Sequence, residues 1–269
     1  DGEHDFVSNP RVSPDGRRLA WLSWDLPDMP WDSATLWVAD LEAGGVLGPV
    51  QRVAGGSGDS VFQPEWHPDG RLVFAWDPKG WWNLHAWDGA NTEVLLDRDT
   101  EFGLPQWVFG MRTYDILPSG TIVSAYSRGG SWNLLRIAGE VIAEIELPYT
   151  DIGGVRALGE DVVFIGASAQ VASGIVRCTP DTGETKVIKC SSEHRFEAED
   201  LSIGEPVTFE TTDGAQAHGF YYSPCNAAYS APEGDHPPLI VRGHGGPTGA
   251  SSASLSLAIQ YWTNRGFAV

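Results

Sequence analysis

The sequence predicts an all-β propeller, partial and of about four blades, over residues 1–200, followed by the opening of an α/β domain over residues 201–269. Three observations predict this fold class. A sequence pattern of a turn followed by a strand recurs roughly every 40–50 residues in the first part. The composition holds 32 Gly and 12 Trp against only two Met, which is typical of turn-dense β structure. The second part instead shows strand, glycine-rich turn and helical pattern in succession.

The repeated pattern consists of a turn of the Pro-Asp-Gly type followed by an apolar, β-rich run. Proline fixes the first corner of such a turn, and glycine supplies the positive φ that closes it. The turn prolines Pro14, Pro68 and Pro118 recur at spacings of 54 and 50 residues, and a degenerate fourth copy begins at Ala157. Each copy is followed by a second, alternating run, as expected for the outer hairpin of a blade. A two-sheet sandwich would not repeat this pattern in register, so we expect four blades.

A β-hairpin is expected where the second part begins. The alternating run "EPVTFETT" ends at Thr212, the pair Asp213-Gly214 marks a turn, and a second alternating run reaches Tyr222. The later stretch "PLIVRGHGG" opens as a continuous apolar run, which is typical of a strand buried on both faces of a parallel sheet.

The pattern after this strand predicts a helix and a further strand. Leu255, Ala258, Ile259 and Trp262 recur at helical spacing, with serine as the expected cap and Gly266 as the stop. The final "FAV" then begins another buried strand. A parallel sheet needs several neighbouring strands, so we expect the chain to be a truncated piece that ends inside the α/β domain.

Charge and composition limit the classes of partner. The formal net charge is −19, from 17 basic and 36 acidic residues, which argues against a nucleic-acid backbone as partner. No apolar run approaches the ~20 residues of a membrane span, and the first residues show no signal peptide. The three cysteines, Cys178, Cys190 and Cys225, show no metal-ligand spacing. Free thiols in a reducing, cytoplasmic compartment are the main expectation, and a Cys178–Cys190 disulfide is the alternative.

The order of these elements resembles the prolyl oligopeptidase family of serine peptidases, in which a propeller accompanies an α/β-hydrolase domain. The hairpin "VTFETTDGAQAHGFYYSP" and the strand that ends in "GHGGPTGASS" carry the resemblance, which is most similar to the acylaminoacyl-peptidase and aminopeptidase branch. The resemblance implies an enzyme that cleaves short peptides or amides with a Ser-Asp-His triad and no cofactor or metal. That triad would lie beyond residue 269, in the remainder of the catalytic domain. Dimers are common among such enzymes, so a homo-oligomer is a further expectation.

By the same resemblance, the glycine-rich turn supplies half of an oxyanion hole. We expect the backbone N–H of Gly246 to be the donor, Gly245 and His244 to shape the turn, and Pro247 to stiffen it. Glycine is expected there for its backbone angles and for close approach of the substrate. The alternative is an ordinary tight turn between a strand and a helix.

Two acidic segments are candidate substrate contacts. Asp25, Asp28 and Asp32 share a loop with Trp24 and Trp31, and a carboxylate such as Asp28 can hold the free amine of a substrate. A long, proline-rich strand connection explains the loop equally well. Glu101, near Trp107, is a similar candidate, although a solvated turn accounts for it too.

The rival function is a non-catalytic propeller that acts as a binding scaffold. The segment 206–269 argues against this function, because a scaffold propeller has no use for the opening of an α/β domain.

Overall fold

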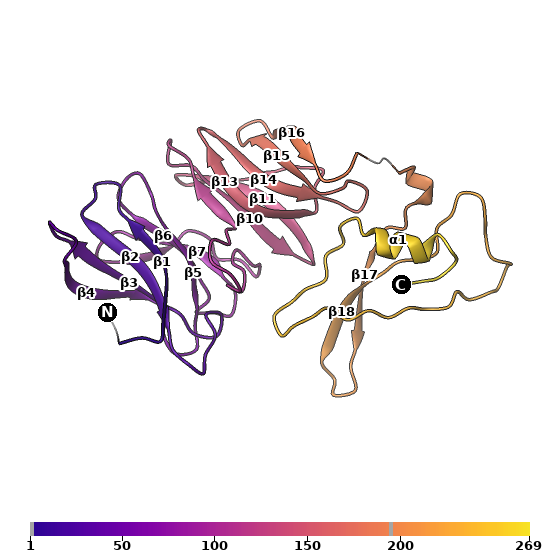
Figure 1. The fold of residues 1–269 in the computed structure, drawn as a ribbon, viewed down its shortest axis with the longest axis horizontal. Helices are drawn as coiled ribbons and strands as arrows, with labels where there is room; N and C mark the ends of the chain where they lie inside the picture. The colour runs from indigo at the N-terminus through magenta and orange to yellow at the C-terminus, as the bar shows by residue number, and fades with distance from the viewer. Residues whose placement is uncertain (1–2, 194–195) are drawn as a thin grey trace.

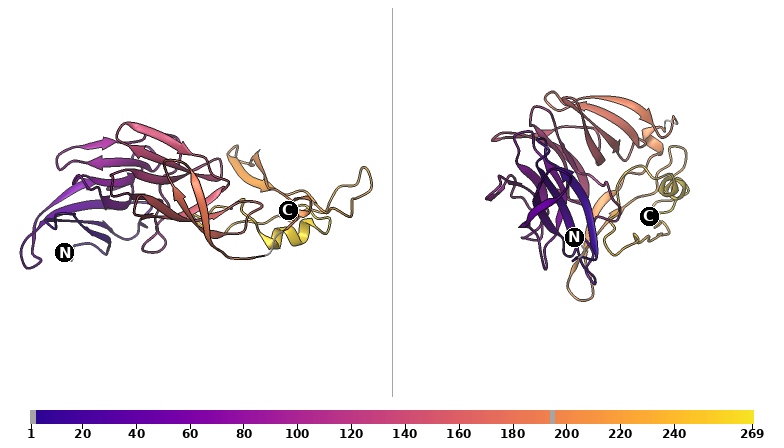
Figure 2. Two further views of the ribbon diagram at one scale, coloured as in Figure 1. Left: turned by 90° about the horizontal axis from the view of Figure 1, so that it is seen from above. Right: turned by 60° about the vertical axis from the view of Figure 1, so that its left-hand side comes forward.

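The computed structural model describes residues 3–193 and 196–269, within which sixteen strands form four antiparallel four-stranded sheets. Each sheet is a meander of consecutive strands, which is the arrangement of a propeller blade. The four sheets lie side by side, with the hairpin and the helix of the C-terminal part at the opposite end of the molecule from β1–β4 (Figures 1 and 2). The prediction of four propeller blades is confirmed.

The strands of the four blades are three to eight residues long. The first two comprise β1 (Phe6–Val12), β2 (Arg18–Trp24), β3 (Thr35–Leu41), β4 (Leu47–Ala54), β5 (Val61–Trp66), β6 (Leu72–Trp76), β7 (Asn83–Trp87) and β8 (Thr92–Val94). The last two comprise β9 (Tyr114–Ile116), β10 (Ile122–Arg128), β11 (Ser131–Ala138), β12 (Val141–Ile145), β13 (Asp151–Leu158), β14 (Asp161–Ala167), β15 (Gly174–Thr179) and β16 (Glu184–Cys190).

The predicted Pro-Asp-Gly turns join the first and second strands of their blades. Gly16, Gly70 and Gly120 have φ values of +73°, +93° and +87°, as the turn requires. The N–H of each glycine donates to the carbonyl oxygen three residues earlier, at 2.9, 2.9 and 2.8 Å. The repeat in the sequence is therefore a repeat of turn geometry.

Three hydrophobic clusters hold the blades together, one between each pair of neighbours. Leu22 of the first blade packs with Phe74 of the second, Phe62 of the second with Tyr126 of the third, and Val123 of the third with Phe164 of the fourth. All of these side chains are buried. An inner blade packs against a neighbouring blade on each of its two faces. Its strands therefore carry apolar residues on both faces, unlike the strands of a sheet with one solvated face.

The innermost strands carry a row of charges that joins all four blades. Glu65 in β5 accepts from Arg11 in β1 at 3.0 Å and pairs with Arg112 at 2.8 Å. Arg112 also pairs at 2.8 Å with Asp115 in β9, whose second oxygen accepts the N–H of Ala157 in β13 at 2.9 Å. Because the row alternates in sign and its members are mostly buried, each charge is compensated by a neighbour.

The predicted hairpin is confirmed. Strands β17 (Glu205–Glu210) and β18 (Gln216–Tyr221) pair across a turn in which Gly214 has a φ of +81°. A short 3-10 helix, η1 (Ala198–Asp200), precedes them. The division of domains at residue 200 stays a prediction.

A small β-α-β unit follows the hairpin. Tyr222 and Val269 exchange two backbone hydrogen bonds of 2.8 and 3.0 Å, so the last residues lie directly beside the end of β18. Ala268 in turn forms a parallel bridge with Leu239, and helix α1 (Leu257–Thr263) connects the two extended segments. The order across this nascent sheet is therefore β17, β18, 267–269, 238–240, with the later segment inserted between the hairpin and the earlier segment. A parallel pair joined by a helix is the opening of an α/β sheet.

The C-terminal strand and helix are only partly covered by the described residues. The strand expected at "PLIV" pairs only over residues 238–240 and on one side, so Leu239 and Val241 are exposed. The helix α1 buries Gln260 and Thr263, and its apolar positions are exposed or half-buried. The Gln260 amide donates to and accepts from the backbone of Ser202, both at 2.8 Å, and this pairing sets the orientation of the helix.

The helix boundaries agree only in part with the sequence. The N-cap is Ser256, but its side chain makes no capping hydrogen bond, contrary to expectation. Gly266, with a φ of +87°, ends the helical segment as predicted.

Candidate functional site

The predicted oxyanion turn is an exposed loop that follows the extended segment 238–240. Among the described residues, the backbone N–H groups of Gly245 and Gly246 donate to no acceptor, so both are available to a ligand. A Cβ on Gly245 would meet nothing within 4 Å, and one on Gly246 would meet only the Thr248 nitrogen, at 3.7 Å. A side chain at either position would therefore project into open space.

The conformational reason that we expected for these glycines is wrong. Neither Gly245 nor Gly246 has a positive φ. The glycine that the turn itself requires is Gly249, where a Cβ would lie 2.1 Å from the carbonyl oxygen of Gly245. The Gly246–Pro247 peptide bond is cis, a feature that the sequence did not reveal. The missing side chains at Gly245 and Gly246 thus leave room in front of the turn and do not serve its backbone angles.

His244 precedes the two glycines, and its role in shaping the turn stays a prediction. Its side chain is exposed, and Nδ1 contacts the carbonyl oxygen of Gly245 at 2.9 Å. The ring lies over its own turn, which supports a shaping role for this residue.

A propeller loop reaches the turn through a tryptophan. The indole N–H of Trp107 donates to the hydroxyl of Thr248 at 2.7 Å, two residues after Gly246. Trp107 also packs against Trp31, with the ring centroids 4.3 Å apart. Residues 31, 107 and 248, which are far apart in the sequence, therefore meet at one place.

Two further contacts join the propeller to the same C-terminal segment. The Ser252 hydroxyl donates to the Asp151 carboxylate at 2.7 Å, and the N–H of Leu255 donates to the carbonyl oxygen of Ser168 at 2.9 Å. In Figure 1 a loop of the C-terminal part extends toward the sheets, in agreement with these contacts. The segment after the turn is thus fixed against the fourth blade, and the turn itself against the loop between the second and third blades.

Only one acid of the 25–32 loop is without a partner in the described part of the chain. The Asp25 carboxylate contacts His4 at 2.8 Å and accepts the N–H of Asp5 at 2.7 Å. Hydrogen bonds to His4 and Asp5 lower the pKa of Asp25. Asp32 accepts the N–H of Met29 at 3.1 Å. The carboxylate of Asp28 makes no such contact and is half-buried, so it remains available to a ligand.

Glu101 has a structural partner. Its carboxylate accepts the backbone N–H of Trp82 at 3.1 Å, and its backbone pairs with Ser127. Burial raises the pKa of Glu101, the hydrogen bond from Trp82 opposes this shift, and the nearby charge of Asp77 adds to it. These contacts do not bring Glu101 to the turn at Gly246.

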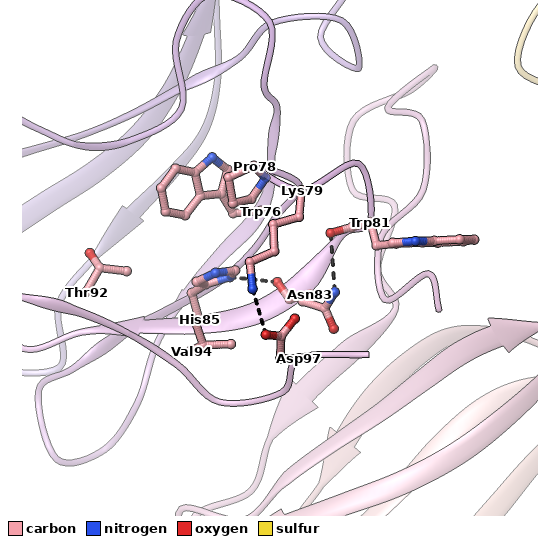
Figure 3. A pocket seen from close by; sticks show the side chains of 9 residues that line it. All are labelled: Trp76, Pro78, Lys79, Trp81, Asn83, His85, Thr92, Val94 and Asp97. Atoms are coloured by element: carbon pink, nitrogen blue, oxygen red, sulfur yellow. Dashed lines mark hydrogen bonds and ion pairs between the residues drawn. The ribbon is translucent and has the colours of Figure 1, made fainter. Parts of the chain in front are cut away.

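A separate cavity of about 150 Å³ lies on the second blade, away from the turn. Its wall contains Trp76 and the buried His85, whose Nδ1 contacts the carbonyl oxygen of Asn83 at 2.9 Å (Figure 3). Lys79 and Asp97 form an exposed ion pair of 2.7 Å at its edge (Figure 3). Burial lowers the pKa of His85, so the ring is neutral at pH 7. The residues that line the cavity lie between Trp76 and Asp97, and none of them belongs to the glycine turn, so the cavity is separate from the candidate site.

The cysteines are free, which decides between the two expectations for them. Cys178 pairs in register with Thr185 and Cys190 with Gly174, so the two lie at opposite ends of the β15–β16 ladder and cannot bond. Burial raises the pKa of the Cys178 thiol to about 11. Within residues 3–193 and 196–269 we find no cluster of acidic, histidine or cysteine side chains suited to a metal ion. No helix in those same ranges is long and apolar enough to cross a bilayer.

Four propeller blades, a hairpin and a β-α-β unit with an open glycine turn define a propeller protein that continues into an α/β domain. Two solved structures are similar to this chain in both sequence and fold. A puromycin hydrolase shares 32% identity with a TM-score of 0.92, over 100% of this chain and 41% of its own. A puromycin-hydrolyzing peptidase of Mycobacterium tuberculosis shares 31% identity with a TM-score of 0.93, over 99% and 41%.

More distant structures share the fold. Dipeptidyl peptidase 4 of Porphyromonas gingivalis shows a TM-score of 0.69 at 11% identity, over 97% of this chain and 37% of its own. No protein-family model matches the chain, and no curated protein matches it either. In fold and in the order of its elements, the chain is similar to part of the prolyl oligopeptidase family of serine peptidases. It spans about two fifths of the length of its puromycin-hydrolysing relatives.

Proposed function

We propose that this chain is part of a serine peptidase that cleaves short peptides or amides through an acyl-enzyme. The nucleophile, the Asp and the His would lie in a segment outside residues 1–269, within an α/β-hydrolase domain that the hairpin and the β-α-β unit begin. The observation that carries the proposal is the 32% identity with a puromycin hydrolase over the entire chain, glycine turn included. An aminopeptidase or acylaminoacyl-peptidase is the subtype that the turn "HGGPT" favours.

The role proposed for this chain in the chemistry is to stabilise the oxyanion. Attack by serine on a carbonyl places negative charge on the carbonyl oxygen, and a preorganised N–H stabilises that charge where water is excluded. Among the described residues the N–H of Gly246 donates to no acceptor, and the glycine has no side chain to crowd a bound oxygen, as such a donor requires. Loss of one donor of this kind lowers the rate by roughly 10²–10³-fold.

Asp28 is the proposed contact for the free amine of a substrate. Its carboxylate is unpartnered among the described residues, and it lies three residues before Trp31, which packs on the tryptophan bound to Thr248. For Glu101 we propose a weaker role, because its carboxylate is already engaged by Trp82. The proposed partners are therefore a peptide or small amide and the remainder of the catalytic domain, and a homo-oligomer remains a proposal. We also propose a cytoplasmic location, which the three free thiols support.

Labelling with a fluorophosphonate tests the proposal. We expect the complete polypeptide to be modified on a serine and residues 1–269 alone to remain unmodified. A matched assay follows the hydrolysis of puromycin and of simple aminoacyl amides. A complete polypeptide that takes up no label and hydrolyses none of these amides would contradict the proposal and favour the scaffold alternative.

A further inference from the structure

The loop that carries Trp107 exposes three consecutive apolar side chains. Trp107, Val108 and Phe109 are 52%, 64% and 74% exposed. We call these three residues, together with Trp31, the aromatic wall. Isolated exposed apolar residues are ordinary, but a contiguous apolar patch beside a polar surface marks a place where something binds.

The aromatic wall is held in place on both sides of its tip. The buried amide of Gln106 donates to the Ser8 hydroxyl at 3.1 Å, just before the tip. The guanidinium of Arg156 donates to the carbonyl oxygen of Gly110 at 3.1 Å, just after it. A loop fixed at both ends presents its side chains without a large loss of conformational freedom when a ligand binds.

The aromatic wall also lies next to the proposed oxyanion donors. Trp107 is bonded to Thr248, and the two residues from Gly246 to Thr248 span at most about 7 Å of chain, so Gly246 lies near the indole. Glycine at 245 and 246 leaves the positions of their side chains open. A carbonyl that reaches the Gly246 N–H would therefore carry its own side chain toward the wall.

We propose that the aromatic wall receives the side chain of the substrate residue that contributes the scissile carbonyl, and that it selects large apolar or aromatic side chains. This inference rests on the proposed peptidase function and adds its substrate class. The chemistry of the wall favours such side chains, because Val108 and Phe109 offer only apolar surface and two tryptophan rings offer faces for stacking. The indole N–H of Trp107 is already occupied by Thr248, so it does not select a polar group.

The test compares aminoacyl amides of Phe, Leu and Ala as substrates of the complete enzyme. We expect a higher kcat/KM for Phe than for Ala, and we expect Trp107→Ala to lower the Phe-to-Ala ratio by about tenfold, as the loss of one apolar contact face predicts. Trp107→Phe keeps a ring and should lower the ratio by less than about threefold. Phe109→Ala, at an exposed position, should fold normally and also lower the ratio. Trp81→Ala, at an exposed tryptophan on the second blade, is the matched control and should leave the ratio unchanged.

Several outcomes distinguish the two proposals. If the wild type turns over these amides but Trp107→Ala and Phe109→Ala leave the Phe-to-Ala ratio unchanged, the proposal for the aromatic wall is overturned and the peptidase function is not. The same follows if Trp81→Ala lowers the ratio as much as Trp107→Ala does, or if the wall variants only lower the melting temperature. A wild-type enzyme that hydrolyses no amide would overturn the peptidase function, and this inference with it.

Discussion

Replacing Gln63 with alanine should loosen the contact between the second and third blades. Gln63 is fully buried, its side-chain N–H donates to the carbonyl oxygen of Tyr114 at 2.6 Å, and its side-chain oxygen accepts the N–H of Thr113 at 2.8 Å. Both backbone partners are buried as well. Each would lose its hydrogen bond in Gln63→Ala, and an unsatisfied buried group costs about 1–3 kcal/mol. We therefore expect the free energy of unfolding to fall by about 2–5 kcal/mol.

Urea unfolding followed by tryptophan fluorescence measures this change, because Trp66 and Trp76 lie in the same blade as Gln63. The matched control is Gln170→Ala, at an exposed glutamine, which should change the free energy of unfolding by less than about 0.5 kcal/mol. A loss below about 1 kcal/mol in Gln63→Ala would refute the reasoning, because two orphaned buried groups cannot cost so little unless water enters the gap.

Three further predictions concern the turn, a buried acid and a thiol. Gly249→Ala should disrupt the glycine turn and lower the activity of the complete enzyme at least tenfold. Gly245→Ala should leave the melting temperature unchanged, because its Cβ meets nothing. Equal effects of both variants on the melting temperature would contradict this prediction. Burial raises the pKa of Glu101 in the folded state. The protonated carboxyl therefore contributes fully to stability when the pH is below the pKa of the unfolded state, near 4.5, and this contribution is lost as the pH rises through the pKa of the folded state. Glu101→Gln should therefore gain stability relative to the wild type as the pH rises from 4 to 7, measured by urea titration at each pH, and a pH-independent difference would exclude this cause. Two of the three thiols should react with a disulfide reagent at pH 8 in the folded protein, and Cys178, with its pKa of about 11, should react only after unfolding; rapid reaction of all three would show that the thiol is not buried.

Much of the propeller was predictable because its signals are local. The turns at Gly16, Gly70 and Gly120 need a positive φ, and this need is visible in four letters of sequence. The alternating runs then fix where strands begin and which residues meet across a hairpin. The hairpin at Gly214 was predictable for the same reason.

Which residues of the C-terminal elements are buried depends on their neighbours, and local patterns do not reveal those neighbours. The spacing of Leu255, Ile259 and Trp262 indicates a helix, but which face is buried depends on what the helix packs against. In the structure that partner is the backbone of Ser202, which selects the polar Gln260. A polar residue in a helical pattern gives no signal that it will be the buried one.

For the candidate site as well, the sequence identified individual motifs, and the tertiary structure determined which of them lie together. The sequence alone singled out the glycine turn, the acids of the 25–32 loop and both tryptophans near them, each as a separate motif. Only the tertiary structure decided that Trp31 and Trp107 meet beside Thr248 and that the turn needs Gly249 for its shape. It also decided that Asp25 is occupied by His4, whereas the Asp28 carboxylate has no partner among the described residues. The physical reason is range: turn chemistry and strand periodicity act over a few residues, whereas contacts between positions 31, 107 and 248 arise only when the blades and the C-terminal segment have packed together.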